Sequence, residues 1–490
     1  MKLTRIAVPA ALALFLAACA HDGVKPLSTG VEAPEAYAEL SDDLPQGQAD
    51  LTAWWTTFSD PVLTGLVARA LDANLDLAQT RERIVQARQQ EIVAGARRLP
   101  QVQADVSAAH NRISENAIPI PPGAGSTPGG GGGVFGLPGS EFNTFHLGAD
   151  ASWELDLFGG AAAGVKAARA RTEAAEWSGR DLRVALAAEV AAHYVALRSL
   201  QQRQGLAWEE LSRQREAFSI AKSRADAGFT SQQEARQAQA QVTAAEAKAY
   251  PLQAQARAEI HALGVLVGDT PESLIAALDA PAPVPATAPP PPGLPSDLLR
   301  RRPDIRKAER NVAAAAADVG AARADLFPKI TLSAQPAFVS TELSSLLDWG
   351  SRNYGISAGL LWPVFEGGRL RASLAAANSR QAEALLAYRQ SVLTALKDVE
   401  DALARYQADE GARGSLAASL EDARAAEALA VDRQKAGIVD QAAVLAARQQ
   451  SLAFADQLAQ AQAARSQDVI ALYRALGGGW SDTDLKETQP

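Results

Sequence analysis

Four segments of the chain alternate between apolar and polar residues, and they come in two pairs. They are residues 101–110, 143–157, 329–338 and 353–363. In the first, Val102, Ala104 and Val106 alternate with Gln103 and Asp105. A period of two over about ten residues is typical of transmembrane β-strands with one face toward lipid. A small soluble sheet with one wet face would show the same alternation, so this pattern alone leaves both alternatives open.

Long helices are predicted beside these segments. Residues 160–227 and 369–436 contain no proline, and their leucines and valines recur at spacings of three and four. At a rise of 1.5 Å per residue, each stretch would form about 100 Å of helix. Such lengths indicate a bundle or coiled coil rather than a compact domain. Shorter helical partners are predicted over residues 61–98, 230–267, 303–326 and 438–477.

The whole arrangement occurs twice. An offset of 209 residues separates Trp153 from Trp362 and also separates Gly228 from Gly437. This internal duplication predicts two structural repeats rather than three ordinary domains. The predicted parts are a first repeat at residues 61–279, a proline-rich strap at 280–295, a second repeat at 296–478 and a tail at 479–490.

The N-terminal residues have the layout of a secretory signal, with a basic start, an apolar middle and small residues at the cleavage point. The motif Leu16–Cys19 resembles the lipobox of bacterial lipoproteins, in which cleavage precedes a cysteine that carries lipid. We therefore expect residues 1–18 to be the signal and residues 19–60 to be a lipid-anchored segment, with a covalent lipid on Cys19. The alternative is an ordinary signal with an incidental cysteine. Because Ala20 rather than Asp follows Cys19, the resemblance implies the outer membrane.

Composition excludes several classes of function. Cys19 is the only cysteine, so no intramolecular disulfide can form, and the net charge of −9 disfavours binding of nucleic acid. The five histidines have no metal-ligand spacing, and no catalytic arrangement of side chains stands out. The run Gly129–Gly133 lacks the Gly-Lys-Ser/Thr ending of a phosphate-binding loop. The sequence therefore predicts neither an enzyme nor a metal site.

Four strands are too few to close a barrel, because eight is the smallest usual number in a membrane and open edges are not tolerated in lipid. If the four alternating segments span a membrane, the chain must therefore oligomerise. The helices beside them would then project from one side of that membrane.

Several motifs carry a family resemblance over nearly the whole mature chain. They are WWTTFSDPVL (54–63), LLRRRPDIRKAE (298–309), ADLFPKITLS (324–333) and LLWPVFEGGR (360–369). With the duplication, these resemble the outer-membrane factor family of TolC-like efflux channels and its NodT-type lipoprotein branch. The resemblance implies a mainly α fold with transmembrane β-strands. It implies a homotrimer with a 12-stranded β-barrel in the outer membrane, continued by a long periplasmic α-helical barrel.

The same resemblance implies a passive exit duct for small toxic compounds, without a cofactor. Its partners would be outer-membrane lipid, a periplasmic adaptor protein and an inner-membrane pump, most often of the resistance-nodulation-division type. Two alternatives stay open. One is a duct for type I-like protein secretion, and the other is a periplasmic adaptor or structural coiled-coil lipoprotein.

The turns between the long helices and their shorter partners are the candidate sites. Gly228 and Gly437 supply the turn conformation. Together with Phe229 and Ile438 they are the expected contacts for the adaptor, at the helix ends farthest from the strands.

The resemblance also implies a gate at these ends, closed by polar contacts that include acidic rings. Asp440 is the first gate candidate, although a solvated aspartate at a helix start is the simpler alternative. Asp226 and Arg433 are weaker candidates. Ala443 and Ala446 stand where relatives often carry aspartates, so a double acidic ring is not expected here.

Overall fold

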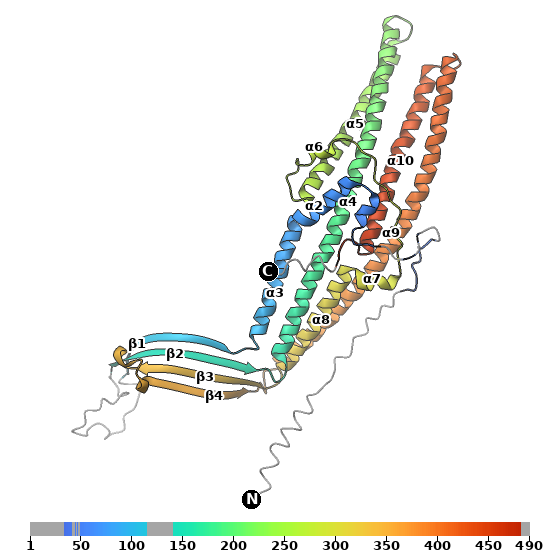
Figure 1. Ribbon diagram of the computed structural model, residues 1–490. Coiled ribbons are helices and arrows are strands. Elements are labelled where there is room, and N and C mark those ends of the chain that lie inside the picture. Colours follow the sequence, from blue (N-terminus) through green and yellow to red (C-terminus); the bar gives the residue numbers. More distant parts are fainter. Residues whose placement is uncertain (1–33, 42–44, 46, 48–49, 115–140, 482–490) are drawn as a thin grey trace, which may run out of the picture. The chain divides into compact units, whose positions relative to one another are not determined.

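The structure is a computed structural model of the chain (Figure 1). The residues that it describes are 34–41, 45, 47, 50–114 and 141–481. Cys19 and the Gly129–Gly133 run lie outside these residues.

Two sets of helices and strands follow one another in the same order. The first contains α2 (Pro61–Ala73), α3 (Leu75–Ala96), β1 (Gln101–Arg112), β2 (Glu141–Leu155), α4 (Gly160–Asp226) and α5 (Gln232–Leu266). The second contains α7 (Pro295–Arg301), α8 (Pro303–Ala324), β3 (Lys329–Ser340), β4 (Arg352–Leu361), α9 (Arg369–Lys435) and α10 (Gln441–Ala475). Short elements are η1 (Trp54–Phe58), α6 (Ile275–Leu278), η2 (Leu343–Ser345) and η3 (Trp349–Ser351).

Three pairs of corresponding helices have equal lengths, whereas α2 has 13 residues and α7 only seven. Helices α3 and α8 have 22 residues each, α4 and α9 have 67, and α5 and α10 have 35. This equality confirms the duplication that the sequence predicts. None of the helices in the described part of the chain combines the length and the hydropathy needed to cross a bilayer.

One predicted helix is wrong. The continuous helix expected over residues 61–98 is broken at Asn74, whose backbone is extended at φ −62° and ψ 130°. The Asn74 side-chain oxygen accepts hydrogen bonds from the amides of Asp76 (2.9 Å) and Leu77 (3.2 Å), and its amide group donates to the Leu266 carbonyl (3.0 Å). Because Asn74 caps α3 while it binds α5, a bend between α2 and α3 replaces the straight helix.

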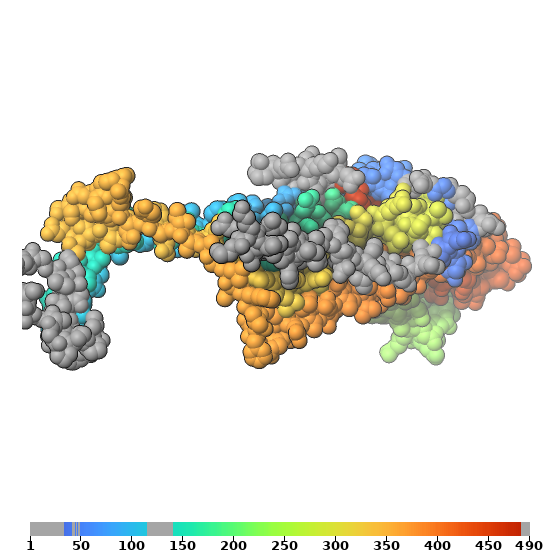
Figure 2. All heavy atoms as spheres, turned by 90° about the horizontal axis from the view of Figure 1, so that it is seen from below, coloured from blue at the N-terminus to red at the C-terminus, as the bar shows by residue number. Residues whose placement is uncertain are grey.

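The helices form two rows, one beside the strands and one beside the turns, and the long helices α4 and α9 belong to both. Beside the strands, the packing order is α3, α4, α8 and α9, and beside the turns α10 packs against both α9 and α4 while α5 packs against α4 (Figure 1). The strands pair in the order β1, β2, β3 and β4, all antiparallel. In the face seen in Figure 2, no helix covers the strands. Along the chain, β1 follows α3 and β3 follows α8, whereas β2 leads into α4 and β4 into α9. Each strand is therefore joined to the helix that has the same place in the packing order.

The junction between β2 and α4 shows how a strand continues into a helix. Gly159 takes the left-handed conformation (φ 75°) just before the helix starts. The Asp156 carboxylate then accepts hydrogen bonds from the first free amides of α4, those of Ala161 (3.1 Å) and Ala162 (2.7 Å). A carboxylate in this position also favours the positive end of the helix dipole.

Aromatic residues join the two ends of the described chain. Trp54 is fully buried and stacks on Tyr473 with ring centroids 5.0 Å apart. Farther along, Trp480 meets Trp177 edge-to-face at 5.3 Å. The first contact holds the segment before α2 against α10, and the second holds the residues after α10 against α4.

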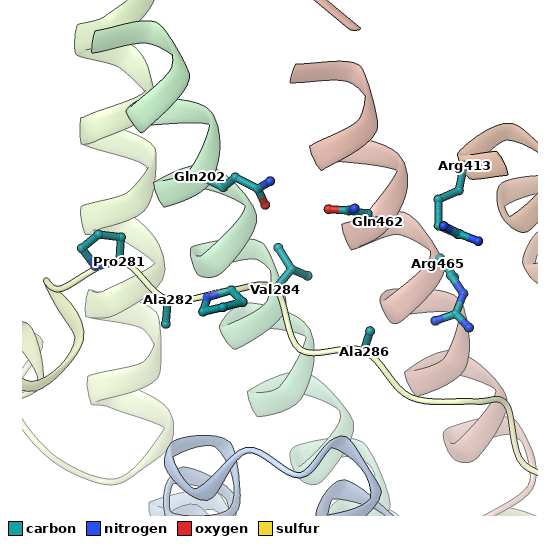
Figure 3. A pocket seen from close by; sticks show the side chains of 9 residues that line it. Gln202, Pro281, Ala282, Val284, Ala286, Arg413, Gln462 and Arg465 are labelled. Carbon is teal, nitrogen blue, oxygen red and sulfur yellow. The ribbon is translucent and has the colours of Figure 1, made fainter. Parts of the chain in front are cut away.

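An extended strap of residues 280–294 crosses α4 and α10 (Figure 3). Its carbonyl groups are held by side chains of both helices. On α4, Arg198 donates to the Ala280 carbonyl (2.8 Å). On α10, Ser466 donates to the Pro285 carbonyl (2.8 Å) and Arg465 to the Thr287 carbonyl (3.1 Å). A groove of about 780 Å³ lies between the strap and helices α4, α9 and α10. The strap connects the two repeats without adding a regular element.

A carboxyl pair lies between α9 and α10. Asp468 is buried, one of its oxygens has no hydrogen-bond partner, and the other is 4.0 Å from Arg405. Burial, with the neighbouring Asp409 carboxyl, raises the pKa of Asp468 to about 7. In the unfolded chain Asp468 would lose its proton near pH 4. The folded state is therefore increasingly penalised as pH rises from about 4 to 7.

Replacing Asp468 with Asn should remove this penalty. We expect the Asp468→Asn variant to be stabilised above pH 7, by more than the ~1.4 kcal/mol equivalent of one pKa unit, and little changed near pH 4. Thermal unfolding of the purified protein at both pH values measures the effect. The exposed Asp422→Asn, on α9, is the control. An equal effect of Asp468→Asn at both pH values would contradict this account.

Candidate functional site

The strand register gathers the apolar residues on one face of the sheet. Ala104 lies opposite Ala149, Trp153 opposite Leu332, and Ala334 opposite Ile356. The residues on this face are Val102, Ala104, Val106, Ala108, Phe145, Leu147, Ala149, Ala151, Trp153, Leu155, Ile330, Leu332, Ala334, Pro336, Phe338, Tyr354, Ile356, Ala358 and Leu360. Several of these side chains are exposed in the single chain, and Ile356 is 84 % exposed. A shift of one residue in register would move this apolar set to the other face, so the alternation specifies the pairing.

The opposite face is polar. Asp105 and His146 are neighbours on it, with 2.7 Å between His146 Nδ1 and a carboxylate oxygen of Asp105. The His146 ring lies over Gly148, where a Cβ atom would come within 2.6 Å of the ring. The His146 ring, two residues earlier on the same strand, and the Ala337 side chain on β3 leave no room for a Cβ atom at Gly148. The spacing of the histidines in the sequence did not predict the pair of His146 and Asp105.

The apolar face ends at charged residues near the loops between paired strands. At that end His110 Nδ1 lies 2.9 Å from the Asn143 side-chain oxygen, and Arg112 pairs with Glu141 at 3.2 Å. Strand β2 runs for eleven residues from Phe145 to Leu155 between this charged end and the helices, which corresponds to about 25 Å when a strand is tilted by roughly 40°. The apolar face thus has the height of the apolar band of a membrane barrel.

Both outer strands leave an edge unpaired in the described residues. Strand β1 pairs only with β2, and β4 pairs only with β3. Their outward N–H and C=O groups are therefore available to another copy of the chain. An open edge of this length is a template for strand pairing.

The first turn, between α4 and α5, is built as the sequence predicts. Gly228 has φ 78°, in the left-handed region that favours glycine. The Phe229 amide donates to the Arg224 carbonyl (2.9 Å), and the Gly228 amide donates to the Ala225 carbonyl (3.0 Å). These two bonds are the Schellman motif, which satisfies the last carbonyls of the helix.

The second turn, between α9 and α10, has the same geometry. Gly437 has φ 72°, and the Ile438 amide donates to the Arg433 carbonyl (2.9 Å). Phe229 and Ile438 hold the same position in the two motifs, and they are 82 % and 71 % exposed. In this motif the apolar residue usually contacts the preceding turn, so its exposure at both turns leaves two apolar tips available to a partner.

The three gate candidates lie next to these turns, and all are exposed. The Asp440 carboxylate caps α10 by accepting from the Ala443 amide (3.0 Å), which matches the simpler reading of a helix-start aspartate. Asp226 is the last residue of α4, where a negative charge opposes the helix dipole, so it does not stabilise its own helix. Arg433, in the last turn of α9, complements the dipole. A gate role for these residues stays a prediction.

Among the residues that the structure describes, no group of three His, Cys, Asp or Glu side chains is placed to hold a metal ion. The polar pairs of the sheet and the charged residues of the turns lack the nucleophile and base arrangement of a catalytic site. What the described residues offer is a one-sided sheet, two bare edges and two exposed tips.

Comparison with known proteins agrees with this geometry. The model of the family described as "Outer membrane efflux protein" matches residues 66–269 and 294–478. The pyoverdine export outer membrane protein OpmQ of Pseudomonas aeruginosa is 32 % identical over 476 residues, which is 95 % of each chain. Nodulation protein T of Rhizobium leguminosarum bv. viciae is 30 % identical over 457 residues, covering 91 % of this chain and 88 % of its own.

The fold is similar to that of solved channels. The outer-membrane channel OprN superposes with a TM-score of 0.82 at 32 % sequence identity, covering 92 % of this chain and 98 % of its own. The expected mainly helical, TolC-like fold with four strands per chain is thereby confirmed. The resemblance to the NodT-type branch is confirmed as well.

The backbone conformation predicts that replacing two glycines with alanine changes the stability of the protein in opposite directions. Gly437→Ala forces a Cβ into the left-handed region and should cost about 1–2 kcal/mol. Gly205→Ala, at an exposed position within α4 with open space around it, should stabilise the protein by about 0.5–1 kcal/mol. Thermal unfolding of the two variants measures both changes. Equal effects would mean that the turn does not require glycine.

Proposed function

This chain belongs to the outer membrane efflux protein family, and from that premise we propose that three copies of it assemble into one export channel. The chain is the outer-membrane channel component of an efflux system, with a periplasmic helical extension, and it is not an enzyme. The observation that carries the assembly proposal is the sheet, which has one apolar face and two bare edges.

Closure of the sheet supports three copies. In lipid, an unpaired backbone group costs about several kcal/mol, so the edges of β1 and β4 cannot stay open there. Pairing β4 of one copy with β1 of the next removes every edge. Three copies of a four-stranded sheet supply twelve strands, an even number within the range of bacterial barrels.

The outer helices support the same closure. Helices α3 and α9 lie at the two ends of the packing order beside the strands. Each carries exposed apolar residues seven positions apart, Val85 and Ile92 on α3 and Leu386 and Leu393 on α9. A spacing of seven places each pair on one helix face. We define this contact, α9 of one copy against α3 of the next, as the seam.

The turn tips support contact with a periplasmic adaptor. Phe229 and Ile438 would present six apolar side chains per trimer at the end of the channel farthest from the sheet. An inner-membrane pump, for which we propose the resistance-nodulation-division type, would deliver cargo through the adaptor. Asp226 and Asp440 of three copies would make this mouth acidic, and Arg433 would offset part of the repulsion.

A covalent lipid on Cys19 is part of the proposal. Its support is the motif Leu16–Cys19 and the membership of the NodT-type branch. The lipid would give each copy a second attachment to the outer membrane beside the sheet.

For the cargo we propose small toxic compounds. One relative is named for the export of pyoverdine, which supports a role in export. The energy for export would come from the pump, because the chain is a channel without catalytic function.

The two faces of the sheet give the test. Ile356→Arg places a charge on the apolar face, which should cost about 2–4 kcal/mol if that face meets lipid near the membrane centre. Ser357→Arg, the next residue on β4, places the same charge on the polar face and is the matched control. We expect Ile356→Arg to lower the amount of trimer in the outer membrane and to raise the susceptibility of cells to exported compounds.

The amount of trimer is measured by native mass spectrometry of the detergent-purified protein. If Ile356→Arg and Ser357→Arg both assemble and function like the unmodified chain, the apolar face does not meet lipid and the proposal fails. If the unmodified protein is monomeric in the outer membrane, the proposed assembly of three copies is also wrong.

A further inference from the structure

The segment Pro34–Ser41 is bound to the surface of α9. Tyr37 is only 4 % exposed, although the residues on either side of it are on the surface. The amides of Ala38 and Glu39 donate to the two carboxylate oxygens of Glu400, at 2.8 Å and 3.0 Å. Gln407, two turns farther along α9, donates to the Glu39 carbonyl at 2.5 Å. We define Glu400 and Gln407 as the clamp.

The clamp binds the backbone of the segment rather than its side chains. One carboxylate accepts two consecutive N–H groups, and such charge-assisted bonds are shorter and stronger than those between neutral groups. The partners are more than 360 residues apart in the sequence. This arrangement fixes the height of the segment along α9, whatever side chains the segment carries.

The clamp continues the seam face of α9. Leu386, Leu393, Glu400 and Gln407 follow one another at intervals of seven residues. They therefore lie along one face of the helix, with a drift of only about 20° per interval. The face is apolar and bare toward the strands, and it is polar and covered by the segment farther away.

Helix lengths match this division. Helix α3 has 22 residues and is about 33 Å long. From the first residue of α9 to Leu393 the distance is about 36 Å, and to Glu400 about 46 Å. If α3 of the next copy lies on the bare part of the face, its far end lies close to Leu393 and about 13 Å short of Glu400. That end is the bend at Asn74, followed by Leu75, which is 66 % exposed.

We propose that the segment Pro34–Ser41 is a contact between copies of the chain: held by the clamp on its own α9, it packs against Leu75 at the α2–α3 bend of the next copy. The inference rests on the proposed trimer. The exposed Leu75 side chain is then covered by the segment Pro34–Ser41 of another copy of this chain. Glu400 acts as a positioning residue, because its bonds to Ala38 and Glu39 fix where the segment lies along α9 relative to the bend.

Disulfide cross-linking in the outer membrane tests the contact. We expect the double variant Ala36→Cys/Leu75→Cys to form disulfides between chains, visible as bands of dimer and trimer size on a non-reducing gel. The control pair is Ala36→Cys/Leu429→Cys. Leu429 is also exposed but lies about 44 Å farther along α9 than Glu400. This control should remain monomeric.

The role of the clamp is tested in the same background. Glu400→Gln removes the charge from both hydrogen bonds and replaces one acceptor oxygen with a donor, so the cross-link between chains should fall by about tenfold. Glu383→Gln, an exposed site on the same helix, should leave it unchanged. An unchanged yield with Glu400→Gln would overturn the positioning role.

The two proposals fail in different ways. If native mass spectrometry finds a trimer but Ala36→Cys/Leu75→Cys forms no bond, or a bond within one chain, the segment is not a contact between copies. If no trimer is found, the proposed assembly itself is wrong.

Discussion

The unpaired backbone groups along β1 and β4 are the constraint on which the rest of the structure depends. A four-stranded sheet with an apolar face and a polar face cannot satisfy these groups alone in a membrane. Since each strand is joined to a helix with the same place in the packing order, the edges of the sheet and of the helix layer coincide. Pairing of β4 with β1 of the next copy would thus also bring α9 against α3 of that copy. This explains why the exposed apolar residues of α3 and α9 lie at those edges.

The duplication makes this closure regular. Helices α4 and α9 have the same length, and both end in a Schellman turn with a glycine and an exposed apolar residue. Three copies would therefore present six nearly equivalent tips to a partner. The differences between the repeats lie elsewhere, in the strap, in the aromatic contacts of Trp54 and in the clamp on α9.

Periodicity predicted most of the fold because the relevant patterns are local. The end of α4 lies within one residue of its expected position, and each alternating segment contains a strand. Features that depend on distant partners escaped prediction. The break at Asn74 depends on its hydrogen bond to Leu266, which is distant in the sequence. The binding of Ala38 to Glu400 likewise leaves no pattern in the residues around Glu400. For the turns, glycine predicted the geometry, whereas Asp440 has a capping role that sequence could not separate from a role in a gate.

We infer that the sheet crosses the outer membrane with its loops outward and its helices in the periplasm. Surface labelling of intact cells tests it most directly, with an epitope inserted at Gly131, in the loop between β1 and β2, and the same epitope at Gly437 as the control. The account predicts that the Gly131 epitope is labelled in intact cells and that the Gly437 epitope is labelled only after the envelope is opened. An inserted protein that reaches the outer membrane but is labelled at neither position in intact cells would contradict it.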